Sequence, residues 1–116
     1  RYDQLLVGSG VGLPKQMDYA RHVYHIYAVR TTERAAMQEA LNAQGVQTGI
    51  HYPFPVHLLP AFADLGYTAG QFPHSERAAN EVLSLPMFPE LTEEQSAAVS
   101  AAVHAFGNRQ PLAKVA

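Results

Sequence analysis

The side chains best suited to chemistry lie in one short stretch around two prolines. Residues 49–57 read Gly-Ile-His-Tyr-Pro-Phe-Pro-Val-His, so a phenol and two imidazoles surround a segment that Pro53 and Pro55 make rigid. A rigid loop at a strand end favours a binding site, because its hydrogen-bonding groups are held at fixed positions. The same pattern is also typical of a proline-rich turn with aromatic packing, and the residues alone leave both interpretations open.

Metal binding receives less support from the spacing of the histidines. The chain has six histidines and no cysteine, which leaves imidazole and carboxylate as candidate zinc ligands. His22 and His25 would point to opposite faces of a strand, so they cannot easily share a metal. His51 and His57 have no evident third ligand. We therefore expect no metal site.

The sequence lacks the arrangements of residues that usually carry out covalent catalysis. The only lysines are Lys15, in a loop after Pro14, and Lys114, in the tail, and neither lies where a buried amine of lowered pKa could form a Schiff base. There is no Gly-x-Ser-x-Gly elbow. Residues 8–12 are rich in glycine, but the helix that would directly follow a nucleotide-binding loop is not predicted after them. We therefore interpret this segment as a connector. We expect no catalytic residue in this chain.

Composition limits the classes of protein that remain. The 116 residues are 47% hydrophobic and 16% charged, enough apolar content for one folded domain. The formal net charge of -2 provides no basic field for nucleic acid or an anionic membrane. No apolar run reaches the length of about 18 residues that a membrane span requires, and no signal-peptide pattern opens the chain. We expect a cytoplasmic protein.

The first half of the chain predicts two strands and a helix that would hold the rigid stretch. Residues 23–30 are β-branched and aromatic and predict a central strand. A helix follows over 33–44, with Thr32 as its N-cap and Gly45 at the C′ position. A second strand over 46–52 ends where the prolines begin.

The second half predicts mainly helices. A short helical turn over 57–65 is closed by Gly66, a helix starts with Ser75 as its cap, and residues 83–86 form a short edge strand. Thr92 and Gln95 form a capping box for a last helix, whose apolar side chains repeat at helical spacing. The fold class is α+β: a small sheet of two to three strands covered by helices.

Three groups of residues, in this order, resemble the C-terminal region of the DegT/StrS-type sugar aminotransferases. The resemblance runs from about Leu13 to Phe106. The matching motifs are His22-Val-Tyr-His-Ile-Tyr-Ala-Val-Arg30, then Leu41-x3-Gly-Val-x-Thr-Gly-Ile-His-Tyr-Pro-x-Pro-x-His57, then Phe72-Pro-x3-Arg-Ala-x2-Glu-Val-Leu-Ser-Leu-Pro-Met-x-Pro-x-Leu-Thr92.

The resemblance implies the small C-terminal domain of a fold-type-I, pyridoxal-phosphate-dependent enzyme. Such enzymes are usually homodimers that aminate a nucleotide-linked keto-sugar with glutamate or glutamine as donor. Residues 1–12 would be the end of a helix and a connector from a large domain, 13–106 the small domain, and 107–116 a loose tail. The Schiff-base lysine would belong to the large domain, so this chain is expected to be inactive alone and to bind no cofactor.

On this interpretation Tyr52, His57 and His51 would face the cleft and hydrogen-bond the sugar nucleotide. Tyr24 and His25 would serve in core or interface packing. Arg30 is open to two interpretations, an anion contact or a solvated side chain at a strand end.

If the chain is such a small domain, the surface that contacts the large domain would carry apolar side chains. The candidates are Phe54, Leu58, Leu59 and Phe62. The alternative to an enzyme domain is a stand-alone α+β module for binding or oligomerisation, which the composition allows equally well.

Overall fold

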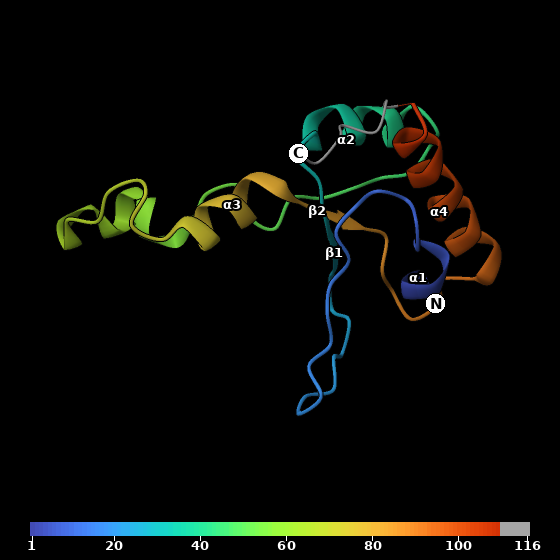
Figure 1. The fold of residues 1–116 in the computed structure, drawn as a ribbon, viewed down its shortest axis with the longest axis horizontal. Coiled ribbons are helices and arrows are strands. Elements are labelled where there is room, and N and C mark those ends of the chain that lie inside the picture. Colours follow the sequence, from blue (N-terminus) through green and yellow to red (C-terminus); the bar gives the residue numbers. More distant parts are fainter. Residues whose placement is uncertain (110–116) are drawn as a thin grey trace.

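Two short strands form the centre of the fold (Figure 1). The computed structural model describes residues 1–109, so most of the tail predicted at 107–116 lies outside the described residues. Strand β1 (Tyr27–Arg30) pairs antiparallel with β2 (Val82–Leu85), and Tyr27 lies opposite Leu85. The predicted α+β class, with a small sheet and covering helices, is confirmed.

Single backbone bridges extend this pair on both sides. Gly12 exchanges two hydrogen bonds with Arg30 of β1, and Gly49 exchanges two with Ser84 of β2. The strand predicted over 46–52 is therefore reduced to one bridge, because the chain turns away from the sheet directly after it. The segment predicted as an edge strand pairs on both sides instead.

Three helices enclose the apolar core with this sheet. Helices α1 (Tyr2–Leu5), α2 (Arg34–Asn42) and α4 (Glu93–Gly107) each contribute buried side chains. Along β1 the side chains alternate, so that Tyr27 and Val29 are buried in the core. The core residues are Tyr2, Leu6, Tyr27, Val29, Met37, Leu41, Val46, Leu83, Leu85, Val99, Ala102 and Val103. We call residues 1–12, 27–49 and 82–109 the core region. None of the helices in residues 1–109 is long and apolar enough to cross a membrane.

The ends of the helices agree with the sequence in some places and not in others. Gly45 has a φ of 76° and donates to Asn42, while Val46 donates to Leu41, which is the Schellman pattern with glycine at C′. The capping box of Thr92 and Gln95 is also confirmed. Thr32, in contrast, is not a cap, because α2 begins after Glu33 without a side-chain cap.

Helix α3 (Pro73–Glu81) begins earlier than predicted. Its N-cap residue is Phe72, which has no side-chain cap, and the proline stands at the first helical position, where its missing N–H costs nothing. The prediction of Ser75 as the cap is therefore wrong.

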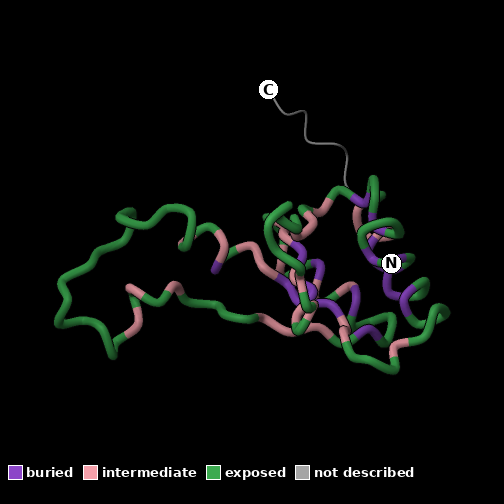
Figure 2. The backbone as a smooth tube through the Cα atoms, turned by 90° about the horizontal axis from the view of Figure 1, so that it is seen from below, coloured by how far each residue is buried: buried purple, intermediate pink, exposed green. Residues whose placement is uncertain are grey.

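Residues 50–81 project from the core region, and we call them the arm (Figures 1 and 2). The arm contains two 3₁₀ helices, η1 (Val56–Leu58) and η2 (Pro60–Leu65), followed by α3. The single helical turn predicted over 57–65 is thus divided into two, and Gly66 ends the second one, as predicted, in the left-handed conformation. The radius of gyration is 15.7 Å, whereas a compact chain of this length has about 13 Å. The arm is therefore a true projection, and Figure 2 shows that most of it is exposed.

A second projection is formed by residues 13–26. The strand predicted over 23–30 begins only at Tyr27. Tyr24 has a φ of 52°, a left-handed conformation that no regular strand contains, and its N–H donates to Nδ1 of His22. This local turn explains why half of the predicted strand is absent.

Candidate functional site

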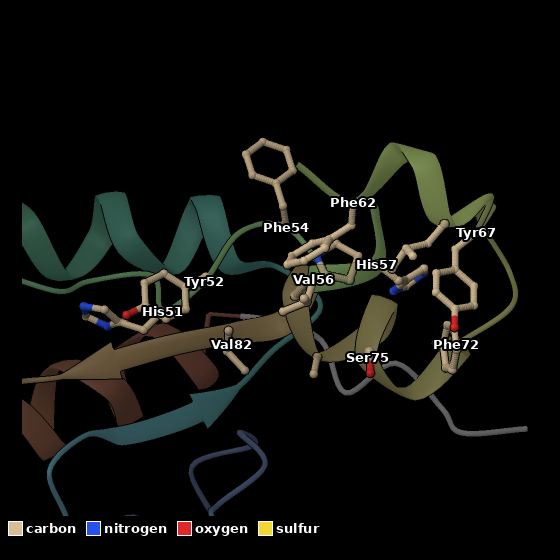
Figure 3. A pocket seen from close by; sticks show the side chains of 14 residues that line it. His51, Tyr52, Phe54, Val56, His57, Phe62, Tyr67, Phe72, Ser75 and Val82 are labelled. Carbon is tan, nitrogen blue, oxygen red and sulfur yellow. The ribbon is translucent and has the colours of Figure 1, made fainter. Parts of the chain in front are cut away.

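The arm contains an open groove of about 540 Å³ between the proline-rich segment, η2 and α3 (Figure 3). Most of its wall is apolar, with a few phenol, imidazole and hydroxyl groups among the rings. The lining residues are His51, Tyr52, Phe54, Pro55, Val56, His57, Phe62, Leu65, Tyr67, Phe72, Ser75, Ala78, Ala79 and Val82. An apolar groove with a few placed polar groups is the usual form of a small-molecule site.

His51 is held against the sheet at the inner end of the groove. Its Nδ1 lies 2.9 Å from Oγ of Ser84, and the side chain of Ser84 is buried. The ring also lies directly over Gly49, where an added Cβ would be 2.7 Å from Cε1 of the imidazole. Gly49 therefore makes room for the ring, and the sheet fixes its position.

Tyr52 follows immediately and, like His51, is exposed. Its side chain is 73% exposed, and its ring packs edge-on against His51 with the centroids 5.6 Å apart. The His51–Tyr52 peptide bond is cis. The phenol is thus available to a ligand.

His57 lies in a different environment, deep in the arm. Its side chain is only 8% exposed. The imidazole packs 4.8 Å from the ring of Phe72 and 6.4 Å from that of Tyr67, and its Nε2 lies 3.0 Å from Oε1 of Glu76. All three predicted residues line one groove, but His57 is at the same time part of the packing that gives the groove its shape.

Glu76, on the first turns of α3, is the residue that sequence reasoning missed. Its carboxylate accepts the backbone N–H of Gly70 at 2.8 Å and 2.9 Å and that of Phe72 at 3.3 Å, besides its contact with His57. The N–H of Gly70 and the contact with His57 hold the pKa of this carboxyl below its ordinary value. No spacing in the sequence connects Glu76 to His57, since 19 residues separate them.

A second cavity, of about 270 Å³, lies in the core region beside α1. There Asp3 accepts hydrogen bonds from the hydroxyl of Tyr27 at 2.5 Å and of Tyr24 at 3.2 Å. Burial raises the pKa of Tyr2 to about 12, and burial followed by the bond to Asp3 raises that of Tyr27 further. Tyr24 packs against the core as predicted, whereas His25 is exposed.

Arg30 forms an ion pair within the chain, and its side chain remains 40% exposed. Its Nη2 lies 2.6 Å, and its Nε 3.0 Å, from Oε2 of Glu81, so the guanidinium is paired within the chain. The pair joins the end of β1 to the end of α3 and fixes the base of the arm. A second bond at this base runs from Nη1 of Arg34 to the carbonyl of Ala79.

Three of the four apolar candidates for an uncovered face are exposed at the surface of the arm. Phe54 is 66% exposed, and Leu58 and Phe62 are each 39% exposed. Leu59 is half-buried. These side chains contribute little to the core that the chain itself forms.

The groove does not offer what pyridoxal phosphate needs. No lysine or arginine is among its lining residues, so it has neither an amine for a Schiff base nor a fixed cation for the phosphate. Lys15 lies in the other projection. No set of three metal-ligating side chains converges within residues 1–109. The groups present are suited to hydrogen bonding and stacking.

Comparisons with known proteins identify the relatives of this chain. A profile of the DegT/DnrJ/EryC1/StrS aminotransferase family matches residues 1–104. A "pleiotropic regulatory protein" from Geobacillus stearothermophilus is 52% identical over 97 residues, which are 81% of this chain and 26% of the relative. The dTDP-3-amino-3,4,6-trideoxy-alpha-D-glucose transaminase of Streptomyces venezuelae is 40% identical over 100 residues, 86% of this chain and 26% of the relative.

The structural comparison agrees. The crystal structure of S. venezuelae DesV in complex with a ketimine intermediate superposes with a TM-score of 0.90 and 39% identity, over 95% of this chain and 30% of DesV. The chain therefore spans about a quarter of the length of the curated relatives that it matches.

Proposed function

The chain belongs to the DegT/DnrJ/EryC1/StrS aminotransferase family, and from this premise we propose that it is the C-terminal small domain of a sugar aminotransferase. The whole enzyme would use pyridoxal phosphate to aminate the keto group of a nucleotide-linked keto-sugar, with glutamate or glutamine as amino donor. The observation that carries the proposal is the superposition on DesV with a TM-score of 0.90. This domain would close one side of the active-site cleft.

The groove of the arm is proposed to hold the sugar nucleotide. Sugar rings have apolar C–H faces that pack on aromatic side chains and hydroxyls that need hydrogen-bonding partners. The exposed phenol of Tyr52 and the two imidazoles of His51 and His57 supply such partners along an apolar wall. Their role is to position the substrate, and none of them forms a covalent bond to it.

The chemistry itself is proposed to lie outside this chain. When bound, pyridoxal phosphate supplies the electron sink for transamination, and the lysine that holds it would come from the large domain. The exposed apolar side chains of the arm would be covered by that domain or by the second subunit of a homodimer. The chain alone is therefore proposed to bind no cofactor and to be inactive.

One experiment tests the inactivity. The chain, first identified by its intact mass, is titrated with pyridoxal phosphate, and the absorbance of an internal aldimine is followed. We expect no saturable band and no stoichiometric adduct after borohydride reduction. A reducible adduct on Lys15 or Lys114 at saturating stoichiometry would contradict the proposal.

A chimaera tests the positive part. Residues 1–104 replace the matching region of the Streptomyces venezuelae transaminase, and transamination of that enzyme's own sugar nucleotide is measured. We expect activity, and we expect Tyr52→Phe in the chimaera to raise KM more than it lowers kcat. A chimaera that dimerises and binds pyridoxal phosphate but neither binds nor converts the sugar nucleotide would refute the assignment. Glu39→Gln, an exposed change on α2, serves as a matched control.

A further inference from the structure

The carboxylate of Glu76 links three parts of the arm. It lies on the first turns of α3 and accepts the N–H groups of Gly70 and Phe72, which fastens the preceding loop to the helix. Its Oε1 also lies 3.0 Å from Nε2 of His57, which stands in η1. The side chain of Glu76 is only 21% exposed, so little water competes for these contacts.

The chemistry of a carboxylate decides which nitrogen of His57 carries hydrogen. The N–H of Gly70 lowers the pKa of Glu76, which is therefore ionised at neutral pH. An ionised carboxylate only accepts hydrogen bonds. Nε2 must then be the N–H nitrogen, and in the neutral ring Nδ1 carries the lone pair.

The second nitrogen of His57, Nδ1, has no hydrogen-bonding partner among residues 1–109 and is not fully enclosed. Among residues 1–109, Oγ of Ser9 is the only enclosed side-chain polar atom without a hydrogen-bonding partner, so Nδ1 of His57 is not a sealed, unsatisfied group. His57 lines the groove (Figure 3), and its ring is confined by Tyr67 and Phe72. The ring therefore has one nitrogen anchored and the other without a partner within the chain, and its neighbours oppose rotation.

We propose that Glu76 is a positioning residue, which holds His57 as the Nε2–H tautomer so that Nδ1 accepts a hydrogen bond from a ligand hydroxyl in the groove. The identification of this ligand as a sugar nucleotide rests on the proposed function. The tautomer of His57 and its dependence on Glu76 are independent of the proposed function. This gives the groove a hydrogen-bond acceptor of fixed direction, and a sugar hydroxyl is a donor that matches it.

The other imidazole of the groove provides an internal contrast. His51 is anchored through Nδ1 to the hydroxyl of Ser84. A hydroxyl both donates and accepts, so it does not impose one tautomer as a carboxylate does. We therefore expect replacement of Glu76 to change the tautomer of His57 and to leave that of His51 as it was.

Long-range ¹H–¹⁵N correlation spectra of the 116-residue chain at neutral pH read both tautomers directly. We expect the Nε2–H form of neutral His57 to predominate by about tenfold or more, because hydrogen bonds to charged groups are the strong ones. Glu76→Gln should lower this ratio about threefold or more, since a neutral amide bonds more weakly and can also donate. Glu39→Gln should leave the ratio unchanged.

Two results would overturn the proposal. One is a predominantly Nδ1–H form of His57 in the unmodified chain, which is decisive even if Glu76→Gln does not fold. The other is an unchanged tautomer ratio in a folded Glu76→Gln variant.

The active chimaera tests the ligand contact. Glu76→Gln should raise KM for the sugar nucleotide with a smaller change in kcat, and an unchanged KM would show that Nδ1 receives no ligand. An inactive chimaera with the expected tautomers would count against the proposed function and not against the role of Glu76.

Discussion

The core region and the arm use similar apolar residues for opposite purposes. In the core region Val29, Met37 and Leu83 have no exposed surface. In the arm, which is equally rich in large apolar side chains, Phe54 is 66% and Val56 65% exposed. The core region therefore completes its own packing, whereas the arm presents a surface that this chain does not cover. The difference teaches that stability and recognition are divided between two parts of the chain.

The largest expected effect on stability comes from comparing the same substitution, Leu→Ala, at one position in each region. Leu83→Ala removes a side chain with 0% exposure and should cost about 2–5 kcal/mol, because a cavity remains in the core. Leu65→Ala, at a position that is 63% exposed on the arm, should change the free energy of unfolding by about 0.5 kcal/mol or less. Urea unfolding followed by circular dichroism measures both. Similar losses for the two variants would show that the arm is part of the cooperative core.

The core region was also the part that the sequence predicted best. The capping box of Thr92 and Gln95 and the glycine at position 45 are local signals, in which one residue satisfies a backbone group a few positions away. The strand predicted over 23–30 failed because Tyr24 adopts a left-handed conformation that its β propensity opposes.

The candidate site was predicted only in part, and for a physical reason. The residues of the rigid stretch were found because proline, histidine and tyrosine occur together there. Glu76 was missed because its contacts cross a loop and depend on where α3 starts, and α3 starts at Pro73 and not after Ser75. The paired state of Arg30 was missed likewise, since Glu81 is 51 residues away.

A second prediction uses the two glycines with the tightest surroundings. A Cβ at Gly107, at the end of α4, would collide with the backbone carbonyl of Ser9, so Gly107→Ala should cost about 1–3 kcal/mol. Gly49→Ala would instead meet the imidazole of His51, a side chain that can swing away. We expect Gly49→Ala to displace that ring from Ser84, which the NMR chemical shifts of the ring would show. The loss of global stability should be smaller than that of Gly107→Ala. The reverse order of stabilities would contradict this distinction.

A third, smaller effect compares the starts of two helices. Thr92→Ala removes the cap of α4 in the core region and should cost about 1 kcal/mol. Ser75→Ala should cost about 0.5 kcal/mol or less, because Ser75 lies within α3 and caps nothing. Thermal unfolding of the two variants checks both values. A larger loss for Ser75→Ala would restore it as the cap.

The smallest effect on global stability, and the most local, is expected from pH. The pKa of Glu76 is lowered in the folded chain by the N–H of Gly70 and by His57, so its contribution is complete above the ordinary pKa of a glutamate and is lost as the pH falls through the lowered value. The pKa of Tyr2 is raised by burial from 10.0 to about 12, so its contribution is complete below pH 10 and is lost as the pH rises toward 12. Acid should therefore loosen the arm first and alkali the core region first.

The ring resonances of Phe72 report on the arm and those of Tyr2 on the core, and Glu76→Gln should remove the acid step of Phe72 alone. If that acid step persists in the Glu76→Gln variant, another carboxyl holds the arm together, and the arm and the core region are not separated by Glu76.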